Sequence, residues 1–196
     1  MRSVFALCAL SFLAVALPAH AAEPLGLDVR KPEDVKPGAG LDKLFDELRH
    51  ERNEQAAERI AGRIQAAWNR SGSANIDLMM QWARKATAEQ RFDVALDFLD
   101  QVTTMKPDYA EGWNRRATVH YMMSDYAKSM VDIEHTLQLE PRHFGALSGM
   151  AGIMKARGRK QMALNAYERV LAIYPMMRSA QAEAASLAED LTGEGI

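Results

Sequence analysis

The 196-residue sequence predicts an all-α protein built from repeated helical units. Between Leu41 and Pro107 there is no proline, and helix-forming residues dominate, with apolar positions three and four apart. No segment alternates apolar and polar residues for long, so we expect no strand. Pro107, Pro141 and Pro175 are 34 residues apart, and a fixed period of this length indicates stacked helical units.

The composition is that of an ordinary globular domain. Hydrophobic residues make up 48% and charged residues 26% of the chain, and the formal net charge is -2. This balance argues against a nucleic-acid partner and against a solvating acidic tail. No run of eighteen or more apolar residues occurs, so we expect no membrane span in the mature chain.

Residues 1–21 have the pattern of a secretory signal peptide. Arg2 supplies a positive charge, residues 4–17 are apolar except for Ser11, and the small-residue sequence Ala19-His20-Ala21 follows. The alternative, a buried first helix of the fold, explains neither the positive charge of Arg2 nor the small residues that follow the apolar run. Cys8 is the only cysteine and lies in this segment, so the mature chain has no disulfide. We therefore expect an exported protein, located in the bacterial periplasm.

Residues 22–40 contain three prolines and three glycines without apolar periodicity, which predicts a flexible linker. Residues 41–75 are predicted to form a degenerate helical pair, a fourth unit of the series. Leu44, Phe45 and Leu48 mark its first helix, and Ile64 and Trp68 its second. Residues 71–73 stand where the other units carry proline.

Three clear units are expected at residues 76–109, 110–143 and 144–177. Small residues recur in each of them, and small residues allow helices to approach closely. In the first helices they are Ala83, Ala117 and Ala151, and in the second helices Ala95, Ser129 and Ala163. Residues 178–196 are predicted to form a capping helix and tail, with acidic side chains that keep the open end of the stack polar.

The recurring small, large and proline positions resemble the tetratricopeptide repeat, a 34-residue helix–turn–helix unit. The resemblance implies a right-handed αα superhelix of three units, with the degenerate N-terminal pair and the C-terminal capping helix. The turns within the units fall at residues 90–92, 124–126 and 158–160. The sequence departs from the family pattern at Arg116, where an apolar residue is usual, and at His120, where tyrosine is usual.

In this family the first helices line a concave groove, and three positions of each helix point into it. Their i, i+4, i+7 spacing places each trio on one helix face. The partner-binding residues implied here are Met80, Arg84, Thr87, Asn114, Thr118, Tyr121, Ser148 and Lys155, with Gly152 as a bare patch. Arginine and tyrosine are common interface anchors, which favours a protein or peptide partner.

Other surfaces remain open as alternatives. The same side chains could simply form a solvated face, with binding on the outer face, an edge or the linker. Some family members clamp a partner's terminal carboxylate with asparagines and cations. Only Arg84 and Asn114 come near that pattern, so we expect no such clamp.

No constellation of catalytic or metal-binding residues stands out. Residues 145–149 superficially resemble a nucleophile elbow but fall within a predicted helix, where a small-residue packing face is the better interpretation. The histidines form no H-x-x-x-H pair, and the methionines follow a helical spacing typical of core packing rather than of a copper site. We expect no enzyme and no cofactor. The predicted function is a protein-interaction module or assembly scaffold, and the alternative is a self-associating, dimerising repeat protein.

Overall fold

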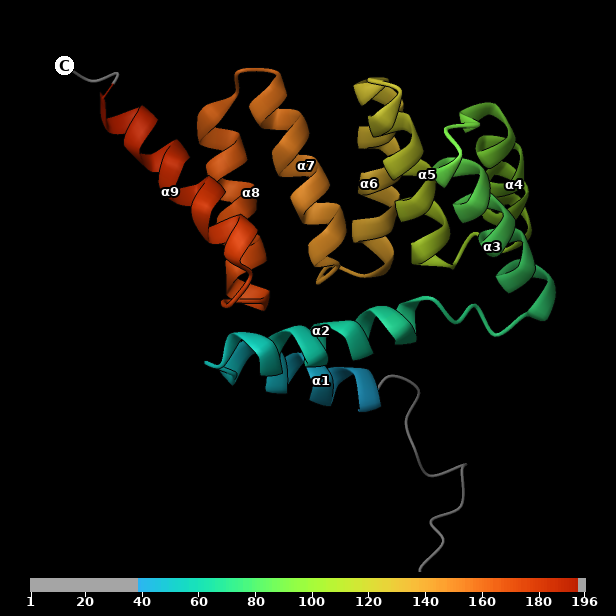
Figure 1. Ribbon diagram of the computed structural model, residues 1–196, viewed down its shortest axis with the longest axis horizontal. Coiled ribbons are helices and arrows are strands. Elements are labelled where there is room, and N and C mark those ends of the chain that lie inside the picture. The colour runs from blue at the N-terminus through green and yellow to red at the C-terminus, as the bar shows by residue number, and fades with distance from the viewer. Residues whose placement is uncertain (1–38, 194–196) are drawn as a thin grey trace, which may run out of the picture. The chain divides into compact units, whose positions relative to one another are not determined.

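The computed structural model describes residues 39–193, and every regular element within them is an α-helix (Figure 1). The helices are α1 (Ala39–His50), α2 (Glu54–Trp68), α3 (Ala74–Ala88), α4 (Phe92–Met105), α5 (Ala110–Met122), α6 (Tyr126–Leu139), α7 (Phe144–Ala156), α8 (Lys160–Ile173) and α9 (Arg178–Gly193). The predicted all-α class is confirmed. The predicted signal peptide, and the predicted linker up to residue 38, lie outside the described residues. None of the described helices is long and apolar enough to cross a membrane.

Helices α3 to α9 pack in chain order, each against the next (Figure 1). The pairs α5/α6 and α7/α8 fall within the second and third expected units, the pair α3/α4 begins at Ala74, two residues before the first, and α9 packs on α8. The small residues predicted at the helix contacts are all buried. Close approach is tightest at Gly112, where an added Cβ would lie 2.8 Å from Val102 Cγ1. The missing side chain at Gly112 therefore lets α5 pack directly on the Val102 side chain of α4 in the preceding unit.

The turn inside each unit uses a left-handed residue at the same repeat position. Gln90, Ser124 and Gly158 have φ angles of 58°, 60° and 69° and are 34 residues apart. The N–H of the following residue donates to the carbonyl five residues earlier in each turn, at 2.8 to 2.9 Å. This is the hydrogen-bond pattern that ends a helix with a left-handed cap. It allows the second helix of the unit to fold back beside the first.

The prolines follow the second helices. The carbonyl of Pro107 accepts a hydrogen bond from Trp113 Nε1 at 2.9 Å, and that of Pro175 accepts one from Gln181 Nε2 at 2.7 Å. Trp113 and Gln181 occupy the same repeat position, two repeat lengths apart. The end of one unit is thereby tied to the first helix of the next helical segment.

The N-terminal pair α1–α2 is helical but does not stack on α3 as a fourth unit. It packs on the far repeats instead, with α1 against α8, and Figure 1 shows it lying across the ends of α7 and α8. One reason is visible in the sequence. Arg49 stands 34 residues before Ala83, where a stacking first helix carries a small residue. A long cationic side chain there prevents close stacking.

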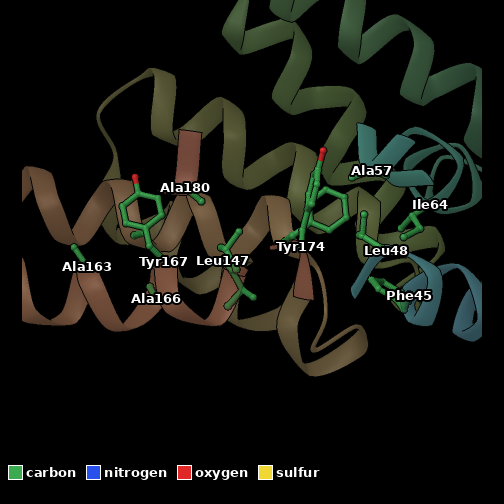
Figure 2. Close-up of a cluster of buried hydrophobic side chains, with 14 of the residues drawn as sticks. Phe45, Leu48, Ala57, Ile64, Leu147, Ala163, Ala166, Tyr167, Tyr174 and Ala180 are labelled. Carbon is green, nitrogen blue, oxygen red and sulfur yellow. The ribbon is translucent and has the colours of Figure 1, made fainter. Parts of the chain in front are cut away.

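A single apolar cluster joins this hairpin to the last unit (Figure 2). Phe45, Leu48 and Ile64 from the hairpin belong to it together with Leu147 and Tyr174. Two ion pairs lie at its margin and connect residues far apart in sequence. Arg142 Nη1 is 2.8 Å from Asp42 Oδ1, and Arg178 Nε is 2.9 Å from Glu54 Oε2. Both apolar burial and charge pairing therefore hold α1–α2 against α7–α9.

Candidate binding groove

Two cavities lie between the first helices of the three units. The α3–α5 cavity has a volume of about 400 Å³ and the α5–α7 cavity about 320 Å³. The first is lined by Met80, Ala83, Arg84, Thr87, Ala88, Gln90, Leu99, Arg115, Thr118, Val119 and Met122. The second is lined by Asn114, Ala117, Thr118, Tyr121, Ser129, Ile133, Gly145, Ala146, Ser148, Gly149, Gly152 and Tyr167.

Most of the predicted groove residues line these cavities. Met80, Arg84 and Thr87 lie in the α3–α5 cavity, and Asn114, Tyr121 and Ser148 in the α5–α7 cavity. Thr118 lines both cavities, so they meet at this exposed side chain. Met80 is only 2% exposed and forms part of the floor rather than the rim. Gly152 lies beside the Tyr121 ring, and a Cβ there would be in ordinary contact with it, 3.4 Å from Tyr121 Oη.

Lys155 is the exception among the predicted groove residues. It lines neither cavity, and its ammonium group donates to Glu183 Oε2 of α9. This hydrogen bond to Glu183 raises the pKa of Lys155. The structure therefore places Lys155 in a surface contact between α7 and the capping helix.

Arg115 is a cavity residue that the repeat pattern did not single out. It sits one residue after Asn114 on α5, and its Nε donates to Glu111 Oε1 at 2.6 Å. Glu111 is only 4% exposed, so Arg115 is held in place by a buried carboxylate. A sequence signal did exist, since Glu111 and Arg115 have the i, i+4 spacing of a helical ion pair.

Glu111 is the centre of a buried polar network below the groove. Its Oε2 accepts from Asn114 Nδ2 at 3.0 Å and lies 3.1 Å from His143 Nε2. Burial raises the pKa of Glu111. The hydrogen bond from His143 and the charge of Arg115 more than offset that effect, so the pKa is lowered. The carboxylate thus stays ionised and orients the side chains of Asn114 and Arg115 at the cavity walls.

His143 connects this network to the N-terminal hairpin. Its Nδ1 accepts from the Ala146 N–H at 3.1 Å, which caps α7 and leaves Nε2 to donate to Glu111. The Trp68 ring of α2 stacks on the imidazole with centroids 4.0 Å apart. Asn69, the residue after Trp68, accepts a hydrogen bond through its Oδ1 from Arg84 Nη1 at 3.4 Å. The end of α2 therefore supports the groove by two routes.

The two departures from the family pattern belong to the packing between helices, not to the groove. Arg116 donates to both carboxylate oxygens of Asp132 at 2.9 and 2.7 Å, and also to Asp100 Oδ1 at 2.8 Å. His120 is buried near the same carboxylate, with Nε2 3.9 Å from Asp132 Oδ2. A charged residue is tolerated at the apolar position because its partner is buried with it. In the part of the chain that the structure describes, no group of three or more potential metal ligands is found.

Comparison with known proteins assigns the repeats. A TPR repeat-containing protein of Rhizobium etli is 52% identical over 176 residues, which cover 90% of this chain and 86% of the relative. The chain belongs to the tetratricopeptide-repeat (TPR) family. Small glutamine-rich tetratricopeptide repeat-containing protein 2 of Saccharomyces cerevisiae is 29% identical over 97 residues, half of this chain but 28% of the yeast protein. No family model matches the chain.

Solved TPR structures share the fold at low identity. The first TPR of Spaghetti (RPAP3) bound to the HSP90 peptide SRMEEVD has a TM-score of 0.57 and 20% identity, covering 60% of this chain and 93% of that chain. The Sgt2 TPR domain of Aspergillus fumigatus has a TM-score of 0.58 and 15% identity, covering 63% and 83%. MamA has a TM-score of 0.55 and 16% identity, covering 75% and 78%. The predicted TPR fold is confirmed.

Proposed function

We propose that this protein is a non-catalytic interaction module that holds a segment of a protein partner along the TPR groove. The observation that carries the proposal is the meeting of two cavities at Thr118, lined by residues of α3, α5 and α7. Concave sites with an apolar floor and a few placed polar groups are the usual binding sites of proteins. The HSP90 peptide bound to the Spaghetti TPR supports a peptide ligand for this fold.

The chemistry of the two cavities differs, which orients the expected ligand. The α3–α5 cavity presents the guanidinium groups of Arg84 and Arg115 beside the apolar side chains of Met80 and Val119. The α5–α7 cavity contains no charged side chain. Three glycines leave room in it, and its walls combine apolar groups such as Ile133 and the Tyr167 ring with hydroxyl groups and one amide. We propose an extended segment with an acidic residue near α3 and a bulky apolar side chain near α7.

The change Thr118→Trp tests the groove, because this exposed side chain borders both cavities and an indole there fills them without disturbing the core. Short peptides selected on the wild type from a random phage-displayed library serve as probes, and fluorescence anisotropy measures Kd. We expect Thr118→Trp to weaken binding by about tenfold or more. Thr104→Trp is the matched control, since Thr104 is exposed on α4 and lines neither cavity.

Unchanged affinity in Thr118→Trp, with circular dichroism showing an intact fold, places binding elsewhere on the molecule. An equal loss of peptide affinity in Thr118→Trp and Thr104→Trp also contradicts the groove, because it reports a general effect of a surface tryptophan rather than occlusion of the cavities.

We propose export to the periplasm on the strength of residues 1–21 alone, with their cationic start, apolar run and small-residue exit. Cell fractionation and N-terminal sequencing check this proposal, with Ala22 expected as the first residue of the periplasmic product. A product that keeps Met1 in the cytoplasm contradicts it.

A further inference from the structure

The edge of the first TPR unit that faces away from α5 is apolar and uncovered. On α3, Leu78 and Trp82 are 42% and 46% exposed, and on α4 Met105 is 61% exposed. Val94, Phe98 and Met105 share one face of α4 by their i, i+4, i+11 spacing. The Trp82 and Phe98 rings meet with centroids 5.3 Å apart, beside a hollow of about 320 Å³. We call these five residues the α3/α4 edge.

In a stack of repeats, an edge of this kind is normally the contact for a preceding unit. The chain has a helical pair directly before α3, but α1–α2 packs on α7–α9 and its own apolar side chains are buried there. The hairpin α1–α2 therefore has no free apolar face with which to cover α3 and α4. The α3/α4 edge carries two neighbouring aromatic rings with no helix of the described chain packed over them. Aromatic clusters of this kind on a surface mark association sites.

We propose that the α3/α4 edge is the interface with a second copy of this chain, arranged with two-fold symmetry. The opposite end of the stack offers no large apolar side chains for a head-to-tail arrangement, because the exposed stripe of α9 consists of small or polar residues: Ala182, Ala185, Ser186 and Glu189. Pairing the α3/α4 edge with α9 would set the aromatic rings against alanines and polar side chains, with no large apolar partner for them. Pairing edge with edge buries apolar surface against apolar surface on both copies.

The charges around the edge are compatible with self-pairing. Lys85 and Arg91 lie beside Glu89, with N–O distances of 4.0 and 3.5 Å, and Asp97 is exposed on α4. Charges of both signs are therefore present around the edge. Each copy also offers both signs to its partner, as an isologous interface requires.

The edge is separate from the groove. On α3 the groove uses Met80, Arg84 and Thr87, whereas the edge uses Leu78 and Trp82, and the two hollows share no lining residue. Dimerisation through the edge therefore leaves the groove of each copy open. A dimer would present two grooves to one partner or to two partners.

Sedimentation equilibrium of the full chain at several micromolar concentrations tests the interface, with Trp82→Glu as the disrupting variant. A buried tryptophan anchor replaced by a charge is expected to raise the dimer Kd by about thirtyfold or more. Val131→Glu is the matched control, because Val131 is 53% exposed on α6, away from the edge, and this variant should sediment as the wild type. Trp82→Glu should also keep the peptide affinity of the groove.

A wild type that stays monomeric up to its highest soluble concentration overturns the proposal, as does a Trp82→Glu variant that dimerises like the wild type. Hydrogen exchange at low and high concentration adds an independent measurement. Protection that rises with concentration is expected on the exposed faces of α3 and α4. If it appears on α9 or in the groove instead, another interface is used and the α3/α4 edge is not the dimer contact.

Discussion

The backbone at Ser124 has the left-handed conformation that glycine adopts at lower cost. The same turn position is occupied by Gln90 in the first unit and by Gly158 in the third, all with positive φ. A residue other than glycine loses about 1 to 2 kcal/mol in the left-handed conformation relative to the right-handed one. Glycine avoids this strain, but its more flexible unfolded chain loses more entropy on folding, which offsets part of the gain. Two of the three turns are thus maintained by the packing of the helices around them.

We expect Ser124→Gly to stabilise the protein by about 0.5 to 1 kcal/mol, because it removes the left-handed strain at an exposed site. The reverse change, Gly158→Ala, should destabilise it by a similar amount, since an added Cβ has open space but an unfavourable φ. Urea titration measures both. A Ser124→Gly variant less stable than the wild type would show that the turn is not strained.

At the scale of helices, Arg116 ties α4, α5 and α6 together through Asp100, Thr103 and Asp132. Asp132 is 2% exposed, and its carboxylate accepts two hydrogen bonds from the guanidinium. The Arg116 guanidinium also lies over the Trp113 ring, 4.8 Å from its centroid. The middle repeat thus holds a buried ion pair where apolar packing is usual in the family, and the same guanidinium joins it to the first repeat through the exposed carboxylate of Asp100.

Arg116→Leu should destabilise the protein by about 3 to 5 kcal/mol, because it leaves the Asp132 carboxylate buried without its partner. Replacing both residues with leucine removes the unpaired charge, and the double variant should recover most of that loss. Thermal or urea unfolding of Arg116→Leu, Asp132→Leu and the double variant gives the coupling free energy between the two side chains. Additive effects of the two changes would contradict the pairing.

The sequence predicted the repeated elements well because their physical requirements are local. The 34-residue spacing of small residues and prolines indicated where helices touch and end, and seven of the eight predicted groove residues line the cavities. It could not predict the position of α1–α2, which depends on Leu48 and Tyr174 meeting across the chain. It also missed Arg115, whose position in the groove is set by the buried Glu111.

For the molecule as a whole, Glu111 links stability to pH. The pKa of Glu111 is lowered in the folded protein from its ordinary value of 4.5. The carboxylate therefore contributes fully to the free energy of unfolding above the pKa of the unfolded state, and this contribution is lost as the pH falls through the pKa of the folded state. Glu111→Gln removes this titration. We expect the stability difference between wild type and Glu111→Gln to shrink as the pH falls from 5 to 3, as measured by urea unfolding at each pH.

Glu189→Gln is the control, because Glu189 is exposed on α9 and the same charge is removed there. Its stability difference from the wild type should stay nearly constant over the same pH range. If Glu111→Gln behaves in the same way, Glu111 does not have a lowered pKa in the folded protein.

The docking of α1–α2 on α7–α9 has a consequence for the order in which the protein is made. The hairpin is synthesised before its partners Leu147, Tyr174 and Leu187, which follow about 100 to 140 residues later. At roughly 5 to 20 residues per second, about 5 to 30 seconds pass between the synthesis of Phe45 and Leu48 and that of the surface that covers them. Among the described helices, α1 and α2 are therefore made first but are among the last to find the surface they pack against.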